Sequence, residues 1–203
     1  MIQIDKTEVN KEEIYSFTLP NFEEYQNKIK QIVLVESNSN INTTPKQECN
    51  VKAGRTAWNS HRKYPIINDI NNDLNDILIQ LIKNENFDVP NIKVGESWIN
   101  WYGKNQFAVP HHHKDCLAAV LFVDVESSDA SFLVHKTSHY MLQKKNESTT
   151  YSNIIQKINV KNGHVILFDG SLVHSVSPNL TDNIRITLAT NFYFTYDKDR
   201  SEY

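Results

Sequence analysis

The chain has 203 residues, of which 39% are hydrophobic and 22% charged, and its formal net charge is -3. These values suit a single globular domain, and the scarcity of basic clusters argues against a nucleic-acid partner. No apolar run approaches the ~18 residues needed to span a bilayer, and the N-terminus lacks the pattern of a signal peptide. The two cysteines do not form a disulfide framework. We therefore expect a cytoplasmic protein without membrane or nucleic-acid partners.

Two segments in the first part of the chain have helical spacing. In residues 21–35, apolar side chains recur every three or four positions after Pro20, which suits a helix start. Residues 66–84 repeat this pattern, with Asn and Asp on the outer face. Residues 36–55 between them are polar and turn-rich, which indicates a long surface loop.

The pattern changes after about residue 90, where short β-prone runs alternate with turn residues. Strands are predicted at 92–102, 106–112, 117–125, 130–134, 154–160, 164–169, 172–176 and 184–196. This spacing favours a β-sandwich or barrel. We predict one α+β, mainly β domain over 1–203, in which a helical support region at 1–90 buttresses a β core at 91–203.

Histidines form the first candidate site. His111, His112 and His113 are consecutive, and alternation along a strand puts His111 and His113 on one face and His112 on the other. His174 lies where a later strand meets a turn. A pair of this kind completed by a distant histidine leaves coordination positions open on a metal, as catalysis at a non-haem iron requires.

Arg185 is the second candidate. It stands inside an apolar strand with no acidic neighbour, ten intervening residues after His174. A buried arginine needs an anionic partner, and its planar fork can hold a carboxylate through two parallel hydrogen bonds. Thr187 shares its face of the strand.

These residues carry a resemblance over about residues 92–193. The motifs are Trp98-Ile99-Asn100, Gly103, the histidine run, the segment from Gly163 to Asn179 that contains His174, and Arg185-Ile186-Thr187 with Asn191. They resemble the 2-oxoglutarate- and iron(II)-dependent dioxygenases, in particular the small oxygenases of bacteria and phages.

The resemblance implies a double-stranded β-helix, a jelly roll like that of the cupins. It implies Fe(II), with 2-oxoglutarate and O2 as cosubstrates, and hydroxylation of a C–H bond of a small molecule or peptidyl residue with release of succinate and CO2. Arg185 and Thr187 would hold the distal carboxylate of 2-oxoglutarate, and Tyr102 or Asn100 would hydrogen-bond the same molecule.

The ligand set differs from the superfamily pattern, which has H-x-D or H-x-E where this chain has H-x-H. Two triads are open: His111, His113 and His174, or His113, Asp115 and His174. The second restores a carboxylate ligand. The first is favoured because Asn100 and Tyr102 precede His111 by the distance seen in related dioxygenases, with Asp115 then a hydrogen-bond acceptor outside the ligand set.

Two other functions remain open. A cupin-like three-histidine dioxygenase would use O2 without 2-oxoglutarate, and a non-catalytic module would bind metal without consuming oxygen. Arg185 and its spacing from His174 argue against the first. The sequence does not identify the substrate or an oligomeric state; residues 36–55 and 136–153 are expected to be lids over the site.

Overall fold

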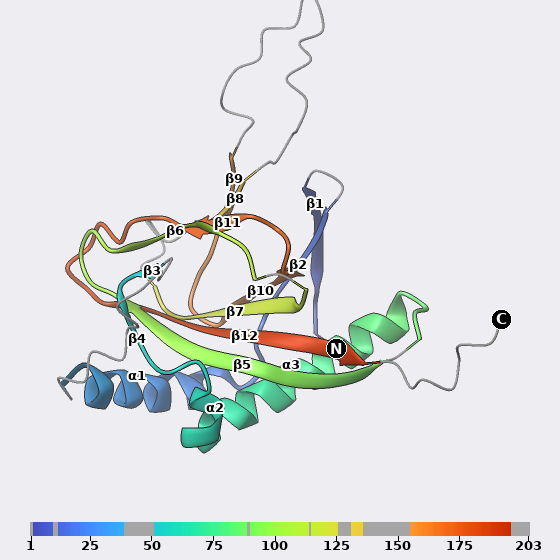
Figure 1. The fold of residues 1–203 in the computed structure, drawn as a ribbon, viewed down its shortest axis with the longest axis horizontal. Coiled ribbons are helices and arrows are strands. Elements are labelled where there is room, and N and C mark those ends of the chain that lie inside the picture. Colours follow the sequence, from blue (N-terminus) through green and yellow to red (C-terminus); the bar gives the residue numbers. More distant parts are fainter. Residues whose placement is uncertain are drawn as a thin grey trace, which may run out of the picture.

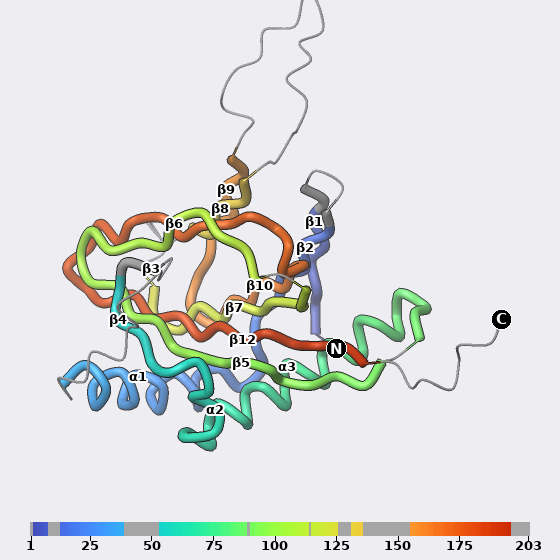
Figure 2. Tube along the Cα trace, viewed as in Figure 1, coloured from blue at the N-terminus to red at the C-terminus, as the bar shows by residue number. Residues whose placement is uncertain are grey.

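The computed structural model describes residues 2–9, 12–38, 51–88, 90–113, 115–125, 131–135 and 155–195. Two antiparallel sheets face one another (Figures 1 and 2). The larger has the strand order β1-β2-β10-β7-β12-β5-β4, and the smaller has the order β3-β6-β11-β8-β9. The core strands are β5 (Asn91–Tyr102), β6 (Phe107–His111), β7 (Leu117–Asp124), β8 (Ser131–His135), β9 (Ile155–Asn159), β10 (His164–Asp169), β11 (His174–Val176) and β12 (Arg185–Thr195).

The chain passes back and forth between the sheets from β5 to β12. Strands β5, β12, β7 and β10 are neighbours in one sheet, and β6, β11, β8 and β9 are neighbours in the other. This arrangement is a double-stranded β-helix, as the sequence predicted. All eight predicted core strands are present, and the largest shift is in β11, which begins at His174 rather than at residue 172.

The central strands of the large sheet are buried on both faces, so they are apolar on both faces too. In β7, Ala118, Val120 and Phe122 belong to a core between the two sheets. Ala119, Leu121 and Val123, which alternate with them, belong to a second core between the sheet and the helices. The inner core lies beside the histidines, since it includes Trp98, Phe132 and Phe168.

Helices α1 (Phe22–Asn38), α2 (Ser60–Lys63) and α3 (Pro65–Asn84) lie on the outer side of the large sheet (Figure 1). Helix α3 begins at a proline, which occupies the first turn without loss of a hydrogen bond. Its buried stripe includes Ile67, Ile70 and Leu74. Both predicted helices are therefore present. No helix among the described residues is long and apolar enough to cross a membrane.

The helical support region predicted for residues 1–90 contains strands as well as helices. Strand β2 (Glu12–Thr18) pairs with β10 and extends the large sheet, and β1 (Asp5–Val9) pairs with β2. In β2, Ile14 faces the inner core and Phe17 the outer one. The glutamates at the start of this strand hide its alternation, which is why periodicity did not reveal it.

The bounds predicted for the loop at 36–55 were wrong at both ends. Helix α1 continues to Asn38, and the short strands β3 (Val51–Lys52) and β4 (Gly54–Arg55) occupy the other end. Strand β3 pairs with β6 and β4 with β5, so the chain changes sheets across Ala53. Residues 39–50, and 136–153 of the second expected lid, lie outside the described residues.

Candidate metal centre

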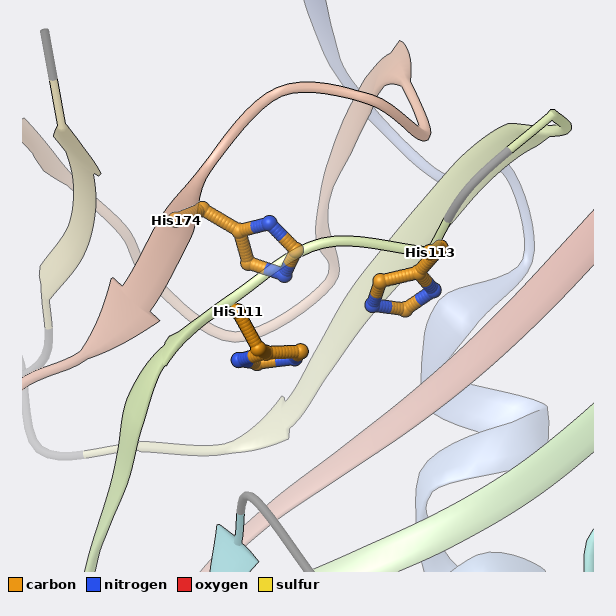
Figure 3. Close-up of side chains that lie close together, drawn as sticks. All are labelled: His111, His113 and His174. Atoms are coloured by element: carbon orange, nitrogen blue, oxygen red, sulfur yellow. The ribbon is translucent and has the colours of Figure 1, made fainter. Parts of the chain in front are cut away.

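Three histidines from the small sheet and its margin converge in the interior (Figure 3). His111 is the last residue of β6, His113 follows two residues later, and His174 opens β11. His174 is directly opposite His111 in the β6–β11 pairing. His112, which was predicted to face away, is exposed and is not part of the cluster.

The three imidazoles are close enough to share one ion. One ligand atom from each lies within 4.8 Å of the others. Ring centroids are 4.3 Å apart for His111 and His174, 5.0 Å for His113 and His174, and 5.3 Å for His111 and His113. Among the described residues, no other group of three or more His, Cys, Asp or Glu side chains meets the same criterion.

Hydrogen bonds determine which nitrogen each ring offers. Nδ1 of His111 lies 2.8 Å from the carbonyl oxygen of Val109, and Nδ1 of His174 lies 3.0 Å from that of Leu172. Nδ1 of His113 lies 2.7 Å from Oδ1 of Asn191. An amide oxygen only accepts, so each Nδ1 carries the proton and each Nε2 retains its lone pair. The three rings are thus in the tautomer that binds a metal through Nε2.

Burial keeps these histidines neutral. It lowers the pKa of His111 to about 4, against an opposing hydrogen bond to the Val109 carbonyl. It also lowers the pKa of His113, and it lowers that of His174 well below the ordinary value. His174 is 2% exposed and contacts the rings of both Phe132 and Phe168. A metal therefore meets three neutral donors at pH 7, with no proton to displace.

Two neighbouring residues are not part of the cluster. Asp115, the alternative ligand, is exposed in a bend, and the cluster does not include it. The Cys116 thiol lies 3.6 Å from the carbonyl oxygen of His113. Burial, followed by nearby carboxylates, raises the pKa of Cys116 to about 11, which keeps it a thiol rather than a thiolate ligand.

The four residues predicted to bind a cosubstrate lie together on the inner face of the large sheet. Arg185 is paired with Tyr102, and Thr187 with Asn100, across β12 and β5. The Arg185 guanidinium lies 4.8 Å from the centre of the Tyr102 ring and donates hydrogen bonds to the carbonyl and hydroxyl oxygens of Ser177. All four are at most 5% exposed. They form a buried cationic site lined by hydroxyl and amide groups.

This cationic site and the histidines share one face of β12. Arg185, Thr187, Ala189 and Asn191 are spaced by two and point inward, and Asn191 reaches His113. Thr187 and Ala189 thus leave a strip of small side chains between the guanidinium and the histidine cluster.

The residues present fit both an iron ion and a dicarboxylate. Asn100 supports this, because its Oδ1 is buried without a hydrogen-bond partner and its Nδ2 is 3.5 Å from the Thr187 hydroxyl. With the amide turned over, the hydroxyl donates to Oδ1 and Nδ2 can donate to a carboxylate. Three neutral imidazoles are suitable donors for divalent iron.

Sequence reasoning missed part of this region. Glu96 contacts Asn191 and was not singled out, and Arg55 is buried on β4 opposite Asn100. The Arg55 guanidinium lies 3.8 Å from the ring centre of Trp58, which packs edge-on against Trp98. Arg55 is the last residue of the predicted loop and Trp58 lies just after it, so only their residue types could have indicated a role.

Comparison with known proteins identifies one family model. Residues 96–191 match the family described as "Putative 2OG-Fe(II) oxygenase". Among curated proteins, none matches this chain in sequence.

Solved structures of the same fold include HygX from Streptomyces hygroscopicus, crystallised with nickel, 2-oxoglutarate and hygromycin B. It has 13% identity and a TM-score of 0.61 over 90% of this chain and 83% of that one. SnoK, an alpha ketoglutarate dependent carbocyclase from nogalamycin biosynthesis, has 14% identity and a TM-score of 0.62 over 92% and 84%. A prolyl-4-hydroxylase from Pseudomonas putida has 8% identity and a TM-score of 0.60 over 96% and 94%. At these identities the likeness establishes the fold.

Proposed function

We propose that this chain is a 2-oxoglutarate- and iron(II)-dependent oxygenase, the family whose model its residues 96–191 match, and that it binds iron through His111, His113 and His174 and hydroxylates a C–H bond. The observation that carries the ligand assignment is that all three rings are held in the same tautomer. Each Nδ1 is held by an oxygen, which leaves the three Nε2 atoms for one ion.

Arg185 is proposed to hold the distal carboxylate of 2-oxoglutarate. It is 3% exposed, and it lies beyond Thr187 and Ala189 on the face of β12 that leads to the histidines. With Oδ1 of Asn100 accepting from the Thr187 hydroxyl, Nδ2 of Asn100 would donate a hydrogen bond to the same cosubstrate. Since these groups are removed from water, their hydrogen bonds to a carboxylate are stronger than exposed ones.

The overall reaction converts a substrate C–H bond, O2 and 2-oxoglutarate into a C–OH group, succinate and CO2. Bound iron supplies the site at which O2 and the keto acid react. The inner core, with Trp98 stacked on His113 at 5.7 Å and Phe168 beside His174, keeps bulk water from that site.

The proposed substrate is a small molecule or a peptidyl residue. HygX is described with hygromycin B bound and the Pseudomonas protein as a prolyl-4-hydroxylase, so this fold accommodates both a small molecule and a prolyl residue. Trp58 supports an approach beside β5, because it is 44% exposed and contacts the Trp98 ring that stacks on His113.

An anaerobic titration tests the cosubstrate assignment. Addition of 2-oxoglutarate to the Fe(II) protein should produce a metal-to-ligand charge-transfer band, and admission of O2 should then yield succinate. Arg185→Leu should weaken 2-oxoglutarate binding by about 30-fold or more, since loss of one partner of a buried charge pair costs about 2–5 kcal/mol. Arg185→Lys should lose less, because it keeps the charge but not the planar fork.

Arg62→Leu is the matched control, since Arg62 is exposed on α2, and it should bind 2-oxoglutarate as the wild type does. Absence of the band in the wild-type protein would refute 2-oxoglutarate dependence. Oxygen consumption without succinate would instead assign the chain to the three-histidine dioxygenases that use no keto acid.

A further inference from the structure

The bond between His113 and Asn191 depends on which way the Asn191 amide is turned. Oδ1 must face the imidazole, since only an oxygen accepts from Nδ1–H. The Asn191 Nδ2 atom donates to Oε2 of Glu96 over 3.2 Å. A carboxylate oxygen that accepts from a donor must face Nδ2 of the amide, so Glu96 fixes Nδ2 on its own side and Oδ1 on the side of His113.

Glu96 is itself held in place by local strand geometry. Asn191 pairs with Glu96 and Phe192 with Val94, so Gly95 is skipped in the pairing and forms a bulge in β5. The Tyr193 hydroxyl donates to the same Oε2 atom over 3.0 Å. A Cβ atom at position 95 would lie 2.1 Å from the Tyr193 ring, so glycine is the residue that lets this ring reach Glu96.

A three-histidine site lacks the negative charge that a carboxylate ligand gives to the two-histidine-one-carboxylate sites of non-haem iron oxygenases. Asp115, the expected compensating group, is exposed and outside the cluster. Glu96 is half-buried and lies one amide away from a ring of the cluster. Hydrogen-bonded groups of this kind orient a metal-bound imidazole and make it a stronger donor.

We propose that Glu96 is a positioning residue for the metal, and that through Asn191 it orients His113 and supplies the negative charge that a carboxylate ligand would otherwise provide. The inference rests on the proposed function only in placing a metal at the histidine cluster. It assigns to this chain a carboxylate–amide–imidazole relay that spans β5, β12 and the end of β6.

Cobalt(II) affinity of the metal-free protein tests the relay, because it requires neither 2-oxoglutarate nor turnover. Glu96→Gln should weaken cobalt binding by roughly tenfold, and Asn191→Leu by up to about a hundredfold, the range found for partners of metal-bound histidines. Glu36→Gln is the matched control, since Glu36 also accepts a tyrosine hydroxyl, that of Tyr64, and should leave affinity unchanged.

The double variant Glu96→Gln with Asn191→Asp is the rescue. It places a carboxylate directly on His113 and should restore cobalt affinity to at least the wild-type value. Adding Glu96→Gln to Asn191→Leu should not weaken cobalt binding further, since Asn191→Leu already removes the hydrogen bonds that connect Glu96 to His113.

Equal cobalt affinity in Glu96→Gln and wild type would overturn the inference, and so would additive losses in the Glu96→Gln, Asn191→Leu pair. Failure of the rescue in a protein that keeps its wild-type thermal stability would also overturn it. If the wild type binds cobalt but forms no succinate with iron, the proposed function fails while the relay is still tested.

Discussion

Single residues show where pattern reasoning succeeded and why it was incomplete. Strand alternation predicted that His111 and His113 would share a face, and they do converge. Strand β6, however, ends at His111. His113 is placed instead by its backbone hydrogen bond to the Gly170 carbonyl and its side-chain bond to Asn191. Both partners are distant in sequence, and no local pattern contains them.

The titration of the same histidines predicts a pH dependence for the metal-free protein. In the folded state the pKa of His111 is about 4, and those of His113 and His174 are also below the ordinary 6.5. As the pH falls from about 6.5 to about 4, the unfolded chain therefore binds protons that the folded chain does not. Stability should be constant with respect to these groups above that window and should fall within it, by up to about 1.4 kcal/mol per pH unit for each histidine.

Urea denaturation at several pH values measures this slope. His111→Asn should show a shallower loss of stability below about pH 6.5, because the variant takes up one proton fewer than the wild type on unfolding. Identical slopes in the variant and the wild type would contradict the assignment of this dependence to the cluster.

At the scale of elements, strands bounded by turn residues could be predicted, and strands without clear alternation could not. The core strands were found because β-branched and aromatic runs end at Gly, Pro, Asn or Asp. Strands β3 and β4 have two residues each, too few to give a period. They exist because β6 and β5 offer edges with which they pair. The periodicity of a short segment cannot predict pairing with strands that are distant in the sequence.

Strand β4 depends on a close approach between Gly54 and Trp101. A Cβ atom at position 54 would lie 2.0 Å from Nε1 of Trp101, so Gly54→Ala should displace the indole and cost about 1–3 kcal/mol of unfolding free energy. Gly103→Ala is the control, because its Cβ would meet its nearest neighbour, Oε1 of Gln106, at 3.5 Å. That change should stay within about 0.5 kcal/mol.

Chemical denaturation of both glycine variants gives the comparison. Equal stabilities would show that the indole moves aside at no cost. A loss confined to Gly54→Ala, together with weaker 2-oxoglutarate binding, would show that the position of β4 and its Arg55 matters to the interior.

For the whole molecule, the resemblance predicted the double-stranded β-helix, and periodicity alone predicted no more than a sandwich or barrel. Neither the resemblance nor the periodicity could predict individual contacts between distant segments. Glu96 and Asn191 are 95 positions apart, and they meet because β5 and β12 are neighbours in the large sheet. The relay to His113 could therefore be recognised only once the two sheets were assembled.

Metal binding should stabilise the whole fold. The ligands come from β6, the segment after it and β11, so the site exists only in the folded chain. Cobalt(II) at about a hundred times its dissociation constant should add about 2.7 kcal/mol to the unfolding free energy. His174→Ala should lose this gain, and His112→Ala should keep it because that side chain is exposed outside the cluster. Unfolding midpoints with and without cobalt measure both effects.

The change of sheet at Ala53 has a mechanical consequence. One residue separates β3 from β4, and Ala53 packs against Tyr102, Ala108 and Val176, of which Tyr102 is paired with Arg185. Because β3 and β4 belong to different sheets, Ala53 fixes the distance between the two sheets at one that a single residue can bridge. We therefore expect any widening of the interior for a bulky molecule to occur at the other end of the two sheets, near the histidines, and not beside Arg185.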